Sequence, residues 1–85
     1  MTKWKVVNAF SAFSDYDNRP ITVLQIYPLE TDYFGDPFDL FLEPKELDFW
    51  KSHIGETFKS KENVDLNRFS SEQLRSLVRE KVEWT

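Results

Sequence analysis

Residues 19–29 read RPITVLQIYPL, and this stretch decides the expected fold. Successive side chains of a strand point to opposite faces, so Leu24 and Ile26 share one face while Ile21 and Val23 share the other. Both faces are therefore largely apolar. A strand that is apolar on both faces is typical of the centre of a sheet, and we predict a central strand here.

A second strand is predicted directly upstream. Residues 4–13, WKVVNAFSAF, are rich in β-branched and aromatic side chains. The residues between the two stretches are turn formers, and Asp15, Asp17 and Asn18 have side chains that can bond the backbone of a turn. We therefore predict an antiparallel hairpin.

Downstream, a loop that contains Gly35 precedes a third predicted strand at residues 38–42. Pro44 is suited to the first position of a helix, because its φ angle is preset and its missing N–H is not needed there. Gly55 follows at the position of a left-handed C-terminal cap, which indicates a helix of about ten residues. Residues 56–61 are predicted to form a short fourth strand.

The two predicted helices each have an apolar stripe. In the first helix the stripe consists of Leu47, Trp50 and Ile54. The second helix is expected to begin at Ser70, because Ser70 and Gln73 have the spacing of a capping box. Its stripe is predicted to contain Leu74, Leu77, Val78 and Val82, with Trp84 continuing it and pinning the last helical turn on the sheet.

The order of these elements predicts an α+β fold over residues 1–85, in a single domain. We expect an antiparallel sheet of three to four strands, with a short middle helix and a C-terminal helix packed on one face. Leu, Ile, Val and Phe make up 25 of the 85 residues, enough for a small packed core.

Several classes of protein are excluded by composition. Without cysteine the chain has no disulfide, no thiolate zinc site and no cysteine nucleophile. No apolar run exceeds three residues, so we expect neither a signal peptide nor membrane contact and predict a cytoplasmic protein.

Catalytic motifs are not found either. Two glycines cannot form a glycine-rich phosphate loop, and a single histidine cannot form a His-Glu-x-x-His metal motif. That histidine, His53, is interpreted as a solvated side chain at a helix end. We therefore predict no enzymatic activity, no cofactor and no metal site.

Charge is distributed unevenly along the chain. Residues 30–48 contain seven acids and one base, a net charge of −6, whereas the whole chain carries −4 and has a pI near 4.9. Four aromatic residues lie in the same segment, and Phe49 and Trp50 follow it directly. An acidic surface with exposed rings suits a basic protein partner, because charge steers encounter and desolvated rings supply affinity. The alternative is that the acids only solubilise the domain while the rings form its core.

The first functional hypothesis is therefore a small acidic protein-binding module. One form of it is an inhibitor that masks a basic, nucleic-acid-binding surface, with carboxylates in the place of phosphates. Tyr33 and Phe34 fit neither a strand nor a helix pattern, so we expect at least one of these rings to be exposed. The predicted contact residues are Asp32, Tyr33, Phe34, Asp36, Asp39 and Glu43, with Glu46 and Asp48 as weaker members.

Two other functions remain open from the sequence. One is a small β-barrel that stacks single-stranded nucleic acid on Trp4, Phe10, Phe13, Tyr16 and Tyr27. The acidic pI argues against direct nucleic-acid binding unless the basic residues Lys3, Lys5, Arg19, Lys59 and Lys61 cluster in space. The other is an assembly subunit that adds an exposed strand edge to another sheet.

Overall fold

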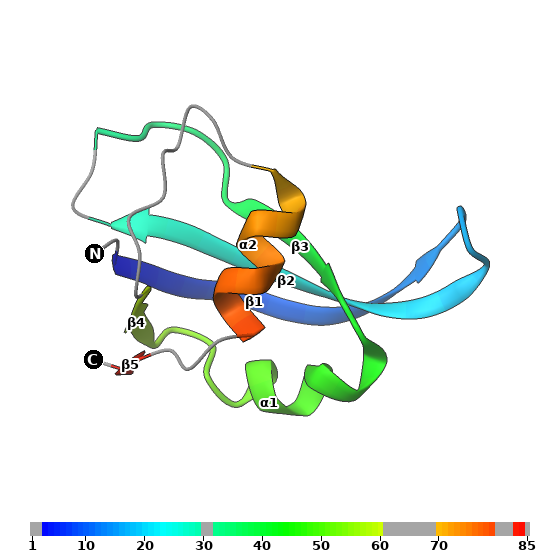
Figure 1. Ribbon diagram of the computed structural model, residues 1–85. Coiled ribbons are helices and arrows are strands. Elements are labelled where there is room, and N and C mark those ends of the chain that lie inside the picture. The colour runs from blue at the N-terminus through cyan, green and yellow to red at the C-terminus, as the bar shows by residue number, and fades with distance from the viewer. Residues whose placement is uncertain (1–2, 30–31, 61–69, 80–82, 85) are drawn as a thin grey trace.

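The computed structural model describes residues 3–29, 32–60, 70–79 and 83–84. The elements in chain order are β1 (Lys3–Ser14), β2 (Arg19–Leu29), β3 (Phe38–Leu42), the 3-10 helix η1 (Pro44–Glu46), α1 (Leu47–Lys51), β4 (Thr57–Lys59), α2 (Ser71–Arg79) and β5 (Glu83–Trp84). The strands form one antiparallel sheet in the order β3-β2-β1-β4-β5. The predicted α+β class, antiparallel sheet and two helices are confirmed, and β5 adds two residues beyond β4 (Figure 1).

The central position predicted for β2 is confirmed. β2 pairs with β1 on one side and with β3 on the other. Leu24 and Ile26 are fully buried on one face, and Val23 is only 6% exposed on the opposite face. On the same face as Leu24, the buried hydroxyl of Thr22 donates a hydrogen bond of 2.9 Å to the carbonyl of Glu43. This bond ties the middle of the sheet to the start of η1.

A β-bulge interrupts β1 at Val7. Val6 pairs with Ile26 and Asn8 pairs with Gln25, so Val7 is an extra residue with no partner in β2. The composition that predicts β1 does not indicate this bulge. The loop before β4 meets β1 at the same point, where the N–H of Gly55 donates to the carbonyl of Val6 at 2.8 Å.

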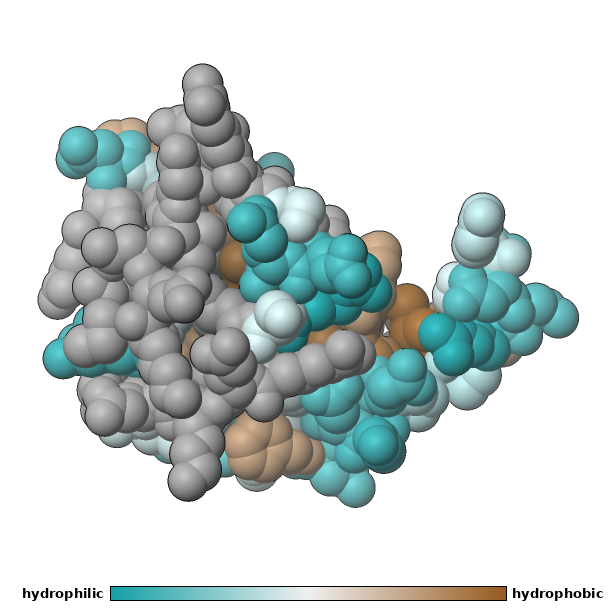
Figure 2. Space-filling view, in the orientation of Figure 1, coloured by the Kyte–Doolittle hydropathy of each residue, from teal (hydrophilic) through white to brown (hydrophobic). Residues whose placement is uncertain are grey.

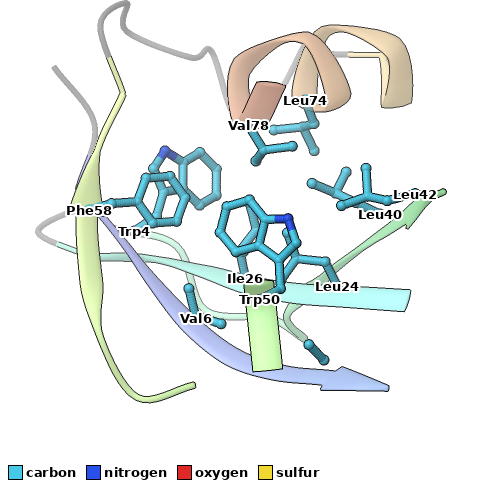
Figure 3. Packing of buried hydrophobic residues seen from close by; sticks show 11 residues of the cluster. Trp4, Val6, Leu24, Ile26, Leu40, Leu42, Trp50, Phe58, Leu74 and Val78 are labelled. Atoms are coloured by element: carbon cyan, nitrogen blue, oxygen red, sulfur yellow. The ribbon is translucent and has the colours of Figure 1, made fainter. Parts of the chain in front are cut away.

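The two helices cover the same face of the sheet, which we call the inner face. Trp50 of α1 and Leu74 and Val78 of α2 are buried against it. Figure 3 shows these side chains pointing toward those of the strands, and Figure 1 shows α2 crossing in front of the sheet. The inner face itself is formed by Trp4, Val6, Ala9, Leu24, Ile26, Leu40, Leu42 and Phe58.

The opposite side of the sheet, which we call the outer face, is not covered by η1, α1 or α2, which pack on the inner face. It lies behind the sheet in the view of Figure 1. The cross-strand register places on it Lys3, Lys5, Phe10, Ile21, Val23, Gln25, Tyr27, Asp39, Phe41, Thr57 and Lys59.

The first helix is shorter than predicted. It begins at Pro44 as expected, but α1 ends at Lys51, and Ile54 is 43% exposed instead of joining Trp50 in a buried stripe. The chain leaves the helix early because Gly55 must reach the backbone of β1. Gly55 has the predicted left-handed backbone, with φ of +90°.

The capping box of α2 is confirmed by two hydrogen bonds. The Ser70 N–H donates to Oε1 of Gln73 at 2.8 Å, and the Gln73 N–H donates to Oγ of Ser70 at 3.1 Å. Leu74 and Val78 are buried as predicted. The predicted stripe residue Val82 lies outside the described residues, as does the end of the predicted fourth strand beyond residue 60.

Gly55 offers a test of this local geometry. An L-residue is disfavoured at φ of +90°, so Gly55→Ala should lower the free energy of unfolding by about 1 kcal/mol, as measured by urea denaturation. No atom lies within 4 Å of the position that a Cβ would take. A D-alanine introduced at this position by chemical synthesis should therefore leave stability unchanged or raise it. Equal losses for the two forms would contradict the backbone explanation.

Candidate functional site

The structure divides the predicted acidic residues into two groups at opposite ends of β3. Asp32 and Asp36 lie in the loop between β2 and β3, whereas Glu43, Glu46 and Asp48 follow β3. The five residues of β3 span about 17 Å, at roughly 3.3 Å per residue. The acids therefore do not form one continuous surface.

The group after β3 has structural roles. The carboxylate of Glu46 accepts a hydrogen bond of 3.1 Å from the Glu43 N–H, which caps the start of η1. Asp48 is exposed in the first turn of α1, where a negative charge favours the helix dipole. Asp39 lies between the two groups on the outer face, and its Oδ1 accepts a hydrogen bond of 3.0 Å from Gln25 Nε2.

The loop between β2 and β3 is built around Tyr33. The Tyr33 hydroxyl donates a hydrogen bond of 2.7 Å to the carbonyl of Asp36, three residues further along the loop. The Tyr27 hydroxyl in turn donates to the carbonyl of Tyr33 at 3.1 Å. The ring of Tyr33 lies 5.6 Å from that of Tyr27 and 5.0 Å from that of Phe38. Tyr33 thus braces the loop against the sheet.

Gly35 allows the Tyr33 ring to fold back over the loop. A Cβ at position 35 would lie 2.5 Å from the Tyr33 hydroxyl oxygen, closer than side chains tolerate. Glycine is therefore needed for the close approach of the ring. The sequence shows the glycine in the loop, but only the structure shows what approaches it.

Phe34 points away from the loop and is 93% exposed. Asp32, Gly35 and Asp36 are also exposed, so exposed acids flank the ring in sequence on both sides. The expectation that at least one of the two loop rings is exposed is confirmed. The adjacent residues Tyr33 and Phe34 serve different purposes, because one is half-buried and braces the loop while the other faces solvent.

His53 belongs to an aromatic cluster, so its interpretation as a solvated side chain is wrong. Its ring stacks on Trp84 with a centroid distance of 4.0 Å and an interplanar angle of 13°. Its Nδ1 lies 2.8 Å from Oε2 of Glu56, and only 24% of the side chain is exposed. The sequence does not reveal this packing, because Trp84 is 31 positions away.

Trp84 contacts the core from a strand and not from a helix. It lies in β5, opposite Phe58 of β4, and its ring also packs against Trp50 at 5.9 Å. Trp84 therefore packs against β4 and α1, and these contacts differ from the predicted one, in which Trp84 pins the last turn of the C-terminal helix. The expected continuation of the α2 stripe to Trp84 is wrong.

The structure changes the nucleic-acid alternative in two ways. The described strands form an open sheet with β3 and β5 at its edges, so they do not close the barrel that this alternative requires. Trp4 is fully buried and is not available for stacking. Three of the five basic residues named above, Lys3, Lys5 and Lys59, do share one end of the outer face, whereas Arg19 lies at the hairpin turn and Lys61 is outside the described residues.

A cleft of about 340 Å³ lies between the hairpin arm, the end of β3 and α2. Figure 2 shows it as a hollow with apolar atoms at its base, beside the projecting hairpin tip. Its walls include Tyr16, Arg19, Glu43 and Arg75. Arg19 is already paired with Asp17 at 2.9 Å, and the mixed charges of the walls favour no single class of ligand.

Within the described residues, no group of three or more His, Asp or Glu side chains is placed to hold a metal ion. In the same part of the chain, no helix has both the length and the apolar character needed to cross a membrane. Comparison of the chain with models of protein families, with curated proteins and with solved structures finds no match. The candidate site therefore has to be judged from its own geometry, and the β2–β3 loop with Phe34 is the best candidate.

The bracing of this loop can be tested with Tyr33→Phe. The variant loses the hydrogen bond to the Asp36 carbonyl, so the free energy of unfolding should fall by about 1 kcal/mol in urea denaturation. The matched control is Tyr16→Phe, because Tyr16 is 99% exposed and should change stability by less than about 0.5 kcal/mol. A Tyr33→Phe variant as stable as the control would show that the hydroxyl does not brace the loop.

Proposed function

We propose that this domain is a non-enzymatic protein-binding module that inserts Phe34 into an apolar pocket on a basic partner. The observation that carries the proposal is the 93% exposure of a phenylalanine in a loop that is held in place by its own neighbour. Full burial of such a ring on binding is favourable by about 2 to 3 kcal/mol. In the isolated domain Phe34 contributes little of this free energy, because its ring is almost fully exposed to water.

The bracing of the loop favours binding by Phe34. A flexible loop loses conformational entropy when a partner immobilises it, and that loss lowers affinity. Here the hydrogen bonds of Tyr27 and Tyr33 already order the backbone on either side of Phe34. Aromatic side chains presented in this way are typical of the few residues that dominate the binding energy of an interface.

The charges around Phe34 indicate the chemistry of the partner. Asp32 and Asp36, both exposed, flank Phe34 in sequence, in a chain whose net charge is −4. A pocket rimmed by lysine or arginine complements this arrangement and raises the rate of encounter. The function that follows is the masking of a basic surface on the partner, for which a nucleic-acid-binding surface is the best-suited kind.

Phe34→Ala is expected to abolish capture of the partner. Tagged protein would be used to capture partners from a lysate of the cells that make it, at salt concentrations of about 50 and 300 mM, with and without nuclease. The wild-type chain should retain a basic protein more strongly at the lower salt concentration, regardless of nuclease. Phe34→Ala should lose that protein, whereas Tyr16→Ala, which removes an equally exposed ring from the hairpin turn, should retain it.

Charge reversal tests the acidic rim separately. Asp32→Lys combined with Asp36→Lys should weaken capture at low salt, while Glu72→Lys, at an exposed position of α2, should have little effect. Capture that survives both Phe34→Ala and the charge reversal would refute this site. Recovery that depends on nucleic acid would refute the protein-binding function.

A further inference from the structure

The outer face of the sheet carries an apolar row that none of the described helices covers. Phe10 of β1, Val23 of β2 and Phe41 of β3 lie side by side in the cross-strand register. Val23 is nearly buried between the two rings, but Phe10 is 37% and Phe41 58% exposed. Apolar side chains grouped on one exposed face of a sheet are typical of a contact surface.

Opposite charges lie on either side of this row along the hairpin. Lys3 and Lys5 stand on the outer face at one end, and Lys59 lies directly opposite Lys3. The turn at the other end contains Asp15 and Asp17. Along β1, Phe10 lies four paired positions from Lys5, because the bulge residue Val7 adds no step, and four paired positions from Ser14, after which the turn begins at Asp15.

This spacing has the symmetry of a two-fold contact. A half-turn about an axis that lies between the two copies and runs parallel to the apolar row places row against row, and places the lysine end of each copy against the acidic turn of the other. Interfaces between identical chains related by such an axis must be self-complementary in this sense. We propose that the outer face binds the outer face of a second copy of this chain, so that Lys5 of each copy meets Asp15 of the other.

Other charges near the face modify but do not remove this complementarity. Asp17 is paired with Arg19 at 2.9 Å, which leaves Asp15 as the acid of the turn with no ion pair among the described residues. Asp39 is held by Gln25, and Glu83 occupies the register position opposite Lys59. The like charges of Lys3 and Lys59 repel each other in the single chain, so an acidic group brought to this end is stabilising.

The proposal is independent of the protein-binding function of Phe34, because Phe34 lies in the β2–β3 loop and not in the apolar row. Two sheets stacked face to face bury the inward side chains of both and stand about 10 Å apart. The dimer would therefore hide Phe10 and Phe41 and leave the Phe34 loops free. The two sites can be tested with separate variants.

The test is the mass of the full chain in solution, measured by analytical ultracentrifugation from micromolar to millimolar concentration. The wild-type chain should pass from monomer to dimer within this range. Lys5→Glu and Asp15→Lys should each weaken the dimer about tenfold or more, because each variant places like charges together at both ends of the interface. The control Lys51→Glu, which makes the same charge change on exposed α1, should leave the dimer intact.

Reciprocal exchange of the charges provides the decisive comparison. The Lys5→Glu, Asp15→Lys double variant should dimerise again, and so should an equimolar mixture of the two single variants. Phe41→Asn, at an exposed position, should remain folded by circular dichroism and lose the dimer.

Three results would overturn the proposal. The first is a chain that stays monomeric at every concentration, and the second is a dimer that neither Phe41→Asn nor the charge exchange alters. The third is a monomer that binds a single-stranded oligonucleotide with an affinity that Lys5→Glu lowers and Lys51→Glu does not. That outcome would assign the lysines and rings of the outer face to nucleic acid.

Discussion

The burial of large rings between one face of the sheet and its helices is the interaction on which the rest of the structure depends. Trp4, Trp50 and Phe58 are each no more than 1% exposed, and they come from β1, α1 and β4. Because η1, α1 and α2 all pack on the inner face, none of the described helices covers the outer face.

At two places in this domain, a packed side chain lies beside an exposed aromatic ring. The ring and the hydroxyl of Tyr33 hold the β2–β3 loop, whereas the neighbouring ring of Phe34 is exposed. Likewise Val23 fills the space between Phe10 and Phe41, whose rings remain accessible. In both places a packed side chain holds an exposed one in position. This arrangement lets a small domain present rings without becoming flexible around them.

The elements that depend on local sequence could be predicted, and those that depend on distant contacts could not. Alternation located β2, and the Ser70 and Gln73 side chains marked the start of α2. The early end of α1 follows from the bond between Gly55 and Val6, which are far apart in sequence. The same limit applies to the candidate site, since the exposure of one loop ring was predicted but the separation of the acids along β3 was not.

The bulge at Val7 has a consequence for how the length of this chain can vary. Without Val7, Val6 would be followed directly by Asn8, and these residues already pair with the consecutive residues Ile26 and Gln25. Every other side chain of β1 would keep its present face. β1 can therefore lose Val7 without moving any side chain to the opposite face of the sheet. A deletion between Asn8 and Phe10 would instead shift the register by one residue and turn Trp4 from the inner face toward water. This is therefore the position in β1 where the loss of one residue keeps every remaining side chain on its present face.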